Sequence, residues 1–234
     1  MTMTNESLSR LLDRANGAEG PEIIIQRPLT KSVSWARVWL AMPRPDESDS
    51  MQHGNKAYLI RNGQQYVGIV LDHGFADLHV FVPPPHRGQH YLSNALRDVI
   101  LPHLLQDRQE QRITISRNFG QETFQAAERA ALAAGFMLLE LEEDEENVAT
   151  LQFTTRQVLS EIKGENTRPT QQRLTQIRQQ LAYHASCLHM LSAEVELLLG
   201  DKVLPEDIRD LASEVHYLRE RIESAAWDLG PPLE

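Results

Sequence analysis

Apolar and polar residues alternate along the middle of the chain in short runs that end in Asn-Gly or His-Gly. Alternation with a period of two is typical of strands that bury one face, and Asn-Gly is the strongest short hairpin signal. The pattern predicts three consecutive antiparallel strands, over residues 57–63, 64–74 and 76–82.

Three elements are predicted ahead of these strands. They are a short amphipathic helix over 5–16, a β-branched strand over 22–29, and a helix over 31–42, where Val33, Ala36 and Leu40 follow the spacing of a helix.

Helical spacing returns after the three strands, over residues 89–106, and Pro102 is expected to kink or end that helix about one turn early. A strand over 112–118 follows, then an Ala-rich helix over 121–136 that Gly135 stops. Residues 136–156 predict two strands joined by an acidic turn. The order predicts an α/β (α+β) domain with a mixed, mostly antiparallel central sheet flanked by helices.

The last third of the chain has a different pattern. A polar linker is predicted over 158–170, between a domain over 1–157 and an antiparallel two-helix hairpin over 171–234. Apolar residues recur in it at alternating spacings of three and four, with His184 in one core-type position. These positions are Leu174, Ile177, Leu181, His184, Leu188, Leu191, Val195 and Leu198, then Ile208, Leu211, Val215, Leu218, Ile222 and Ala225.

Two helices cover each other's apolar stripes only in part, so the hairpin needs a third surface. That surface is the chain's own first domain, a second copy in a homodimeric four-helix bundle formed through residues 171–227, or a partner protein. The pattern leaves these alternatives open.

Composition and charge argue against several classes of partner and of cellular location. The 234 residues carry 33 acidic and 23 basic side chains, a formal net charge of −10, which repels phosphate backbones and argues against nucleic acid as a partner. One cysteine, Cys187, excludes an internal disulfide, and the first residues do not resemble a signal peptide. No apolar run is long enough to span a membrane, so a cytoplasmic protein is expected.

Three prolines and a glycine separate the strand over 76–82 from the next helix, in the stretch VFVPPPHRGQHYLSNAL. This stretch, the order of elements over about 22–157 and the sequence AALAAGF resemble the GNAT superfamily of N-acetyltransferases. In that superfamily the fourth strand splays from the fifth, acetyl-CoA lies in the cleft, and backbone amides of a turn with the pattern Q/R-x-x-G-x-G/A bind the pyrophosphate. The resemblance implies an acetyl-CoA-dependent transfer of an acetyl group to an amine acceptor, a small molecule or a protein.

The resemblance also implies a site. Val82 would offer backbone to the pantetheine, and Arg87, Gly88, Gln89 and His90 would surround the pyrophosphate. In a separate role, Asp77 or His79 would help to deprotonate the acceptor, because these two side chains share one face of the predicted strand.

The chain departs from the superfamily pattern at several positions. His90 and Leu92 stand where members carry small residues, and Pro83 and Pro85 remove amides near the pantetheine. Ala131 stands where many members carry a tyrosine that protonates the leaving thiolate. The alternative function is therefore a GNAT-like scaffold without catalysis that acts as an interaction module through its C-terminal helices.

Other clusters have two interpretations each. Four histidines lie within 18 residues, His73, His79, His86 and His90, yet their spacing is not that of a metal site, and no metal is expected. The acidic residues of 141–147 either attract a cationic acceptor or are a solvated hairpin tip. The turn at Gly88 itself either binds CoA or only joins a strand to a helix.

Overall fold

The computed structural model of the chain describes residues 3–42, 44, 54–139, 148–154, 169–200 and 203–228. The chain divides into two compact units, Met1–Glu165 and Asn166–Glu234. Most of the predicted linker over 158–170 and all of the acidic turn over 141–147 lie outside the described residues. Among the described helices, none is both long and apolar enough to cross a membrane.

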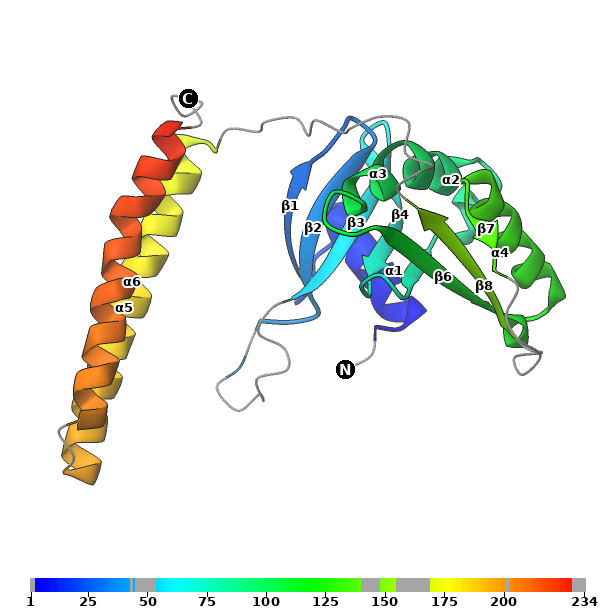
Figure 1. The fold of residues 1–234 in the computed structure, drawn as a ribbon. Helices are drawn as coiled ribbons and strands as arrows, with labels where there is room; N and C mark the ends of the chain where they lie inside the picture. Colours follow the sequence, from blue (N-terminus) through cyan, green and yellow to red (C-terminus); the bar gives the residue numbers. More distant parts are fainter. Residues whose placement is uncertain are drawn as a thin grey trace. The chain divides into compact units, whose positions relative to one another are not determined.

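The first unit contains a five-stranded antiparallel sheet in which each strand pairs with the next one along the chain (Figure 1). Its strands are β1 (Ile23–Pro28), β2 (Val33–Trp39), β3 (Asn55–Asn62), β4 (Gln65–Asp72) and β5 (Leu78–Phe81). The three strands predicted from the alternating pattern are confirmed as β3, β4 and β5, and the predicted strand over 22–29 is confirmed as β1.

The prediction of a helix over 31–42 is wrong, because residues 33–39 form strand β2. Ala36 and Val38 lie in the core under one face of the sheet, while Val33 and Trp35 belong to the core on the other face. A strand that is buried on both faces carries apolar residues at odd and even positions, so the period of two disappears. Its β-branched and aromatic residues were the better indicator of a strand.

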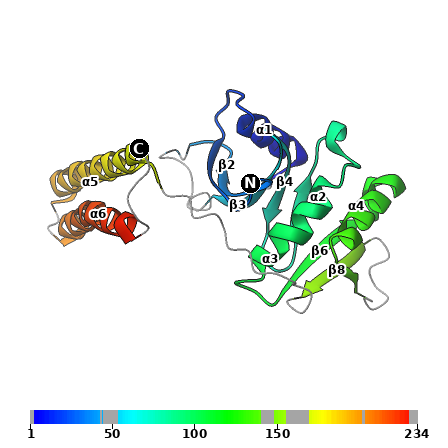
Figure 2. The ribbon, with the colours of Figure 1, turned by 90° about the horizontal axis from the view of Figure 1, so that it is seen from above.

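Helix α1 (Asn5–Ala15) covers one face of this sheet, which confirms the predicted N-terminal helix (Figure 2). Thr4 caps its first turn, and Leu8 and Leu11 are fully buried. At its C-terminal end Asn16 donates to Tyr66 O at 2.9 Å and accepts from Tyr66 N at 2.7 Å. The reciprocal pair holds the end of the helix against β4.

The other face of the sheet packs against helices and a second sheet, whose residues share one core with it. The second sheet has the order β6-β8-β7 and is antiparallel. Its elements and the helices around it are α2 (Tyr91–Ala95), α3 (Leu101–Leu104), β6 (Glu110–Ser116), α4 (Gln121–Ala133), β7 (Met137–Leu138) and β8 (Val148–Thr154), with short 3₁₀ turns at η2 (Pro84–His86) and η4 (Arg117–Phe119).

Pro102 was expected to kink the helix over 89–106 or to end it about one turn early, and the helix continues two residues beyond it, to Leu104. Helix α2 runs directly into a π-helical turn, η3 (Leu96–Ile100), and then into α3, whose first turn contains Pro102. A proline lacks the amide that an α-helical turn would use, and the wider π-helical turn before it accommodates this loss without ending the helix.

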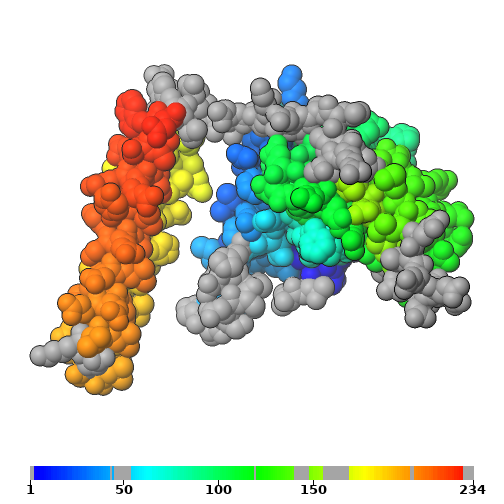
Figure 3. All heavy atoms as spheres, viewed as in Figure 1, coloured from blue at the N-terminus to red at the C-terminus, as the bar shows by residue number. Residues whose placement is uncertain are grey.

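The second unit is an antiparallel hairpin of α5 (Gln171–Leu199) and α6 (Val203–Asp228). The space-filling view shows α6, in orange to red, lying along α5, in yellow (Figure 3). The fold class expected from the sequence is confirmed: a mixed α/β unit of antiparallel sheets flanked by helices, followed by two C-terminal helices packed as a hairpin. The predicted single central sheet is, however, divided into sheets of five and three strands.

Candidate functional site

The division between the two sheets lies between β5 and β6, the strands that the GNAT-like pattern expects to splay. The segment just before β5 and strand β6 are joined by two hydrogen bonds. Arg112 N donates to Phe75 O at 2.7 Å, and Thr114 N donates to Asp77 Oδ1 at 3.0 Å. Both segments advance two residues between these contacts, so they run parallel. Among the described residues, β5 and β6 form no backbone ladder with each other, and the two strands belong to different sheets.

A buried polar network holds the end at which the two sheets meet. Asp72 on β4 pairs with Arg108 at 2.7 Å, with only 4% and 16% of their side chains exposed. Arg108 also donates to Gln111, which is fully buried and donates to Gly74 O at 3.1 Å. Because a buried charge without its partner is costly, this network fixes β6 beside the start of β5.

The turn after β5 is short and held by its own side chains. Arg87 Nε donates to Val82 O at 2.9 Å, and Gln89 Nε2 donates to Pro85 O at 2.9 Å. Gly88 has a φ of 71°, and a side chain built at this position would meet open space. The turn thus brings together the five residues that were predicted to bind CoA, although the carbonyl of Val82 is already bonded to Arg87.

His90 ends this turn in the left-handed conformation, with φ 61° and ψ 6°. Among the described residues it is the one non-glycine with positive φ. It is also the N-cap of α2, and the first helical bond there runs from Asn94 N to His90 O at 3.0 Å. The amides of residues 91–93 precede that bond and therefore point out of the start of the helix.

The two predicted catalytic residues are both engaged. Asp77 accepts from Thr114 N, so its carboxylate helps to join the two sheets. His79 lies half-buried on β5 and donates from Nε2 to Asn5 Oδ1 at 3.0 Å. Burial lowers the pKa of His79, the neighbouring imidazole of His73 lowers it further, and Asp77 opposes both. His79 is therefore neutral near pH 7, with Nδ1 as its proton acceptor.

Ala131, which stands in the position of the superfamily's tyrosine, is 2% exposed and lies in the core shared by both sheets. A hydroxyl that the sequence did not indicate lies nearer to the turn. Tyr91, next to His90, accepts a hydrogen bond from Asn62 Nδ2 at 2.6 Å. The two residues are 29 positions apart, and no local pattern connects them.

A second polar pair, also absent from the sequence patterns, joins β3 to α3. The hydroxyl of Tyr58 lies 2.9 Å from His103 Nδ1, and the ring of Trp35 is 5.8 Å from the imidazole. Burial raises the pKa of Tyr58, while burial and the charge of Arg27 lower the pKa of His103. Tyr58 is 1% exposed and belongs to the core, whereas the imidazole of His103 is partly exposed.

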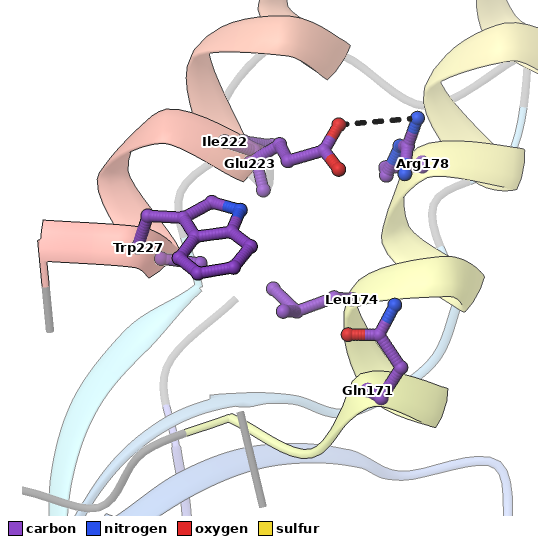
Figure 4. Close-up of a pocket in the computed structure, with 7 residues that line it drawn as sticks. Gln171, Leu174, Arg178, Ile222, Glu223 and Trp227 are labelled. Atoms are coloured by element: carbon purple, nitrogen blue, oxygen red, sulfur yellow. Dashed lines mark ion pairs between the residues drawn. The ribbon is translucent and has the colours of Figure 1, made fainter. Parts of the chain in front are cut away.

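The hairpin carries a separate small hollow at the end where α5 begins and α6 ends (Figure 4). Leu174, Ile222 and Trp227 line it, beside the ion pair of Arg178 and Glu223. Its volume of about 80 Å³ is the space of two or three waters, far below that of a cofactor site.

No group of histidine, cysteine and carboxylate side chains among the described residues could hold a metal ion. The rings of His73 and His79 lie 6.3 Å apart, but they are not joined by a third ligand in that part of the chain. The chain matches no protein-family model, and no curated protein matches its sequence. The relation to the N-acetyltransferases stays a prediction.

Proposed function

We propose that the first unit binds acetyl-CoA at the turn after β5 and transfers the acetyl group to an amine, of a small molecule or of a protein. The observation that carries the proposal is the backbone of His90. This residue occupies the position at which the GNAT motif has its first small residue, and it keeps a left-handed conformation that costs a non-glycine residue about 1–2 kcal/mol. Strain of this kind is common where a backbone is shaped for a ligand.

The arrangement of the strands supports the same proposal. The sheet is interrupted between β5 and β6, and the turn lies at the end of β5, between that strand and α2. Amides that point out of the start of a helix favour an anion. Arg87 uses one of its five N–H donors on Val82 O, which holds its guanidinium at the turn and leaves four donors for a diphosphate.

Acetyl-CoA supplies an activated thioester, so the chain has to position an amine and remove its proton. In this proposal His79 Nδ1 accepts that proton as the amine attacks the thioester carbon, because the imidazole is kept neutral by burial. Its orientation is fixed by the bond from Nε2 to Asn5. Since Ala131 offers no acid, the departing thiolate takes its proton from water, and proximity provides much of the rate.

Calorimetric titration with acetyl-CoA tests binding. We expect micromolar affinity for the wild type and at least about 100-fold weaker binding for Gly88→Glu, because a carboxylate beside a diphosphate is repulsive. Gly63→Glu is the matched control: Gly63 also has positive φ, a side chain there also meets open space, and it lies in the β3–β4 turn. Wild type that gives no heat at millimolar acetyl-CoA contradicts the proposal, as does equal weakening by both variants.

The role of His79 is tested in a panel of amine acceptors. His79→Gln is expected to lower kcat by about 100-fold or more and to leave the affinity for acetyl-CoA unchanged. An unchanged kcat would remove His79 from the mechanism.

The second candidate is the scaffold without catalysis. It is favoured by the position of Ala131 in the core and by the carboxylate of Asp77, which is bonded to Thr114 N. In that case no thioester binds at the turn, and the hairpin provides the surface that binds a partner protein.

A further inference from the structure

Small side chains occupy most of the buried positions in the seam between α5 and α6. These are Ala185 and Ser192 on α5 and Ala212 and Ala226 on α6, and the other two buried residues are Leu174 and Pro205. Ser192 Oγ donates to Pro205 O at 2.7 Å across the seam. Small residues let the two helices approach closely, so the hairpin holds together without using most of its leucines.

The large apolar residues beside the seam form one face of the hairpin. On each helix they recur every seven residues, which returns them to nearly the same side. On each helix these residues come one position before the seam positions, as Leu191 comes before Ser192 and Leu211 before Ala212. Because the two helices are antiparallel, positions with the same offset from the seam lie on the same face of the hairpin. We call it the leucine face: Ile177, Leu191 and Leu198 with the polar His184 on α5, and Leu204, Leu211 and Leu218 with the small Ala225 on α6.

The leucine face is exposed within the hairpin. Leu191 is 50% exposed, Leu198 74% and Leu211 49%. The opposite face is polar and suited to contact with water. There Arg178 pairs with Glu223 at 3.3 Å and Arg209 pairs with Glu196 at 3.1 Å, both across the two helices. A hairpin with cross-helix ion pairs on one face and leucines on the other has the surface pattern of one half of a four-helix bundle.

We infer that a second copy of this chain covers the leucine face, hairpin against hairpin, in an antiparallel four-helix bundle. The area is sufficient. The 26 residues of α6 rise about 39 Å, and two packed helices are about 20 Å wide, so each face presents about 800 Å². A specific interface of ordinary size buries about 800 Å² on each partner.

The charges along the outer edges of the leucine face select the orientation. On α6 this edge carries Asp207, Glu214, Arg221 and Asp228, and on α5 it carries Arg173, Gln180, Cys187 and Glu194, again at heptad spacing. If the two hairpins ran in the same direction, Asp207 would meet Glu194 of the partner subunit, a repulsive pair that cancels the attraction between Asp228 and Arg173 of the partner subunit. In the antiparallel arrangement Asp207 meets Arg221 of the partner subunit, and the reverse pair forms as well.

The two-fold axis of this antiparallel bundle has a defined place. The cross-helix contacts put the middle of α5 beside the middle of α6, so full overlap of the two copies puts the axis near residues 186 and 214. Cys187 then lies close to Cys187 of the partner subunit. The same placement faces Glu214 with its own copy, a single repulsive contact against two attractive ones.

Sedimentation equilibrium of the full chain tests the interface. We expect a dimer at micromolar concentration, and a dissociation constant at least about 100-fold higher for the double variant Leu191→Asp, Leu211→Asp, because both carboxylates would be buried. Leu197→Asp is the matched control: Leu197 is 86% exposed and lies away from the leucine face. Far-UV circular dichroism checks that each variant keeps its helices.

Mild oxidation tests the orientation, because Cys187 is the one cysteine of the chain. The wild type is expected to form a disulfide-linked dimer, and the Leu191→Asp, Leu211→Asp variant, which keeps Cys187, is expected to lose it. A monomeric wild type, or dissociation by Leu197→Asp as well, overturns the inference. A stable dimer that does not cross-link overturns the antiparallel placement.

Discussion

Replacing His90 by glycine is expected to stabilise the first unit. His90 has φ 61°, where a side chain costs about 1–2 kcal/mol that glycine does not pay. Glycine in turn loses more backbone entropy on folding, about 0.4–1 kcal/mol. The hydrogen bond from Asn94 N to His90 O involves only backbone and stays. The net gain is about 0.5–1 kcal/mol, or a rise in Tm of about 1–4 °C for a unit of this size.

The measurement needs a signal from the first unit alone. Trp35 and Trp39 lie in it and Trp227 in the hairpin, so denaturant unfolding is followed by tryptophan fluorescence in a Trp227→Phe background. Gly88→Ala is the opposite control, with an expected loss of about 1 kcal/mol from its φ of 71° and no clash.

A lower stability of His90→Gly would refute this reasoning, since it would mean that contacts of the imidazole outweigh the strain. If His90→Gly is more stable and also binds acetyl-CoA more tightly, the strained turn and the phosphate site are the same feature.

Two further predictions concern the core. Asp72→Ala leaves the buried guanidinium of Arg108 unpaired and is expected to cost about 3–5 kcal/mol in the free energy of unfolding, measured by urea denaturation; a cost below about 1 kcal/mol would contradict the role of this pair. The pKa values of His79 and His103 are both lowered in the fold, chiefly by burial, so the unfolded chain binds protons more readily and stability falls as the pH drops below about 6.5. Replacing both histidines by glutamine should flatten that dependence between pH 7.5 and 5, and an unchanged slope would refute it.

The sequence predicted elements well where local signals were strong. The alternating strands and Asn-Gly turn gave β3 to β5, and the leucine spacing gave α1. It failed at β2, because burial on both faces removes the period that distinguishes a strand. It also could not show the division of the sheet, which depends on contacts such as Asp77 with Thr114, 37 residues apart.

The candidate site was predictable only as a stretch of chain. The residues of the turn are neighbours in sequence and are brought together by it, but the left-handed conformation of His90 and the bond from Arg87 to Val82 O are set by the fold around them. In the hairpin the heptad pattern predicted a packing stripe, yet it could not tell which positions face the other helix. Ala185 and Ser192 are buried there, while Leu191 and Leu198 are exposed.

The two cores of the first unit differ in the length of chain that each requires. The core beneath α1 uses only residues between Met3 and Phe81, and every strand of its sheet pairs with the next one in sequence. The other core extends to Phe153. A ribosome adds the intervening residues in about 4–15 s, whereas local hairpins form in microseconds. The α1 core is therefore expected to assemble first, and the opposite face of its sheet stays open until α2, α4 and β6 to β8 emerge. That interval is when the nascent chain is most exposed to aggregation.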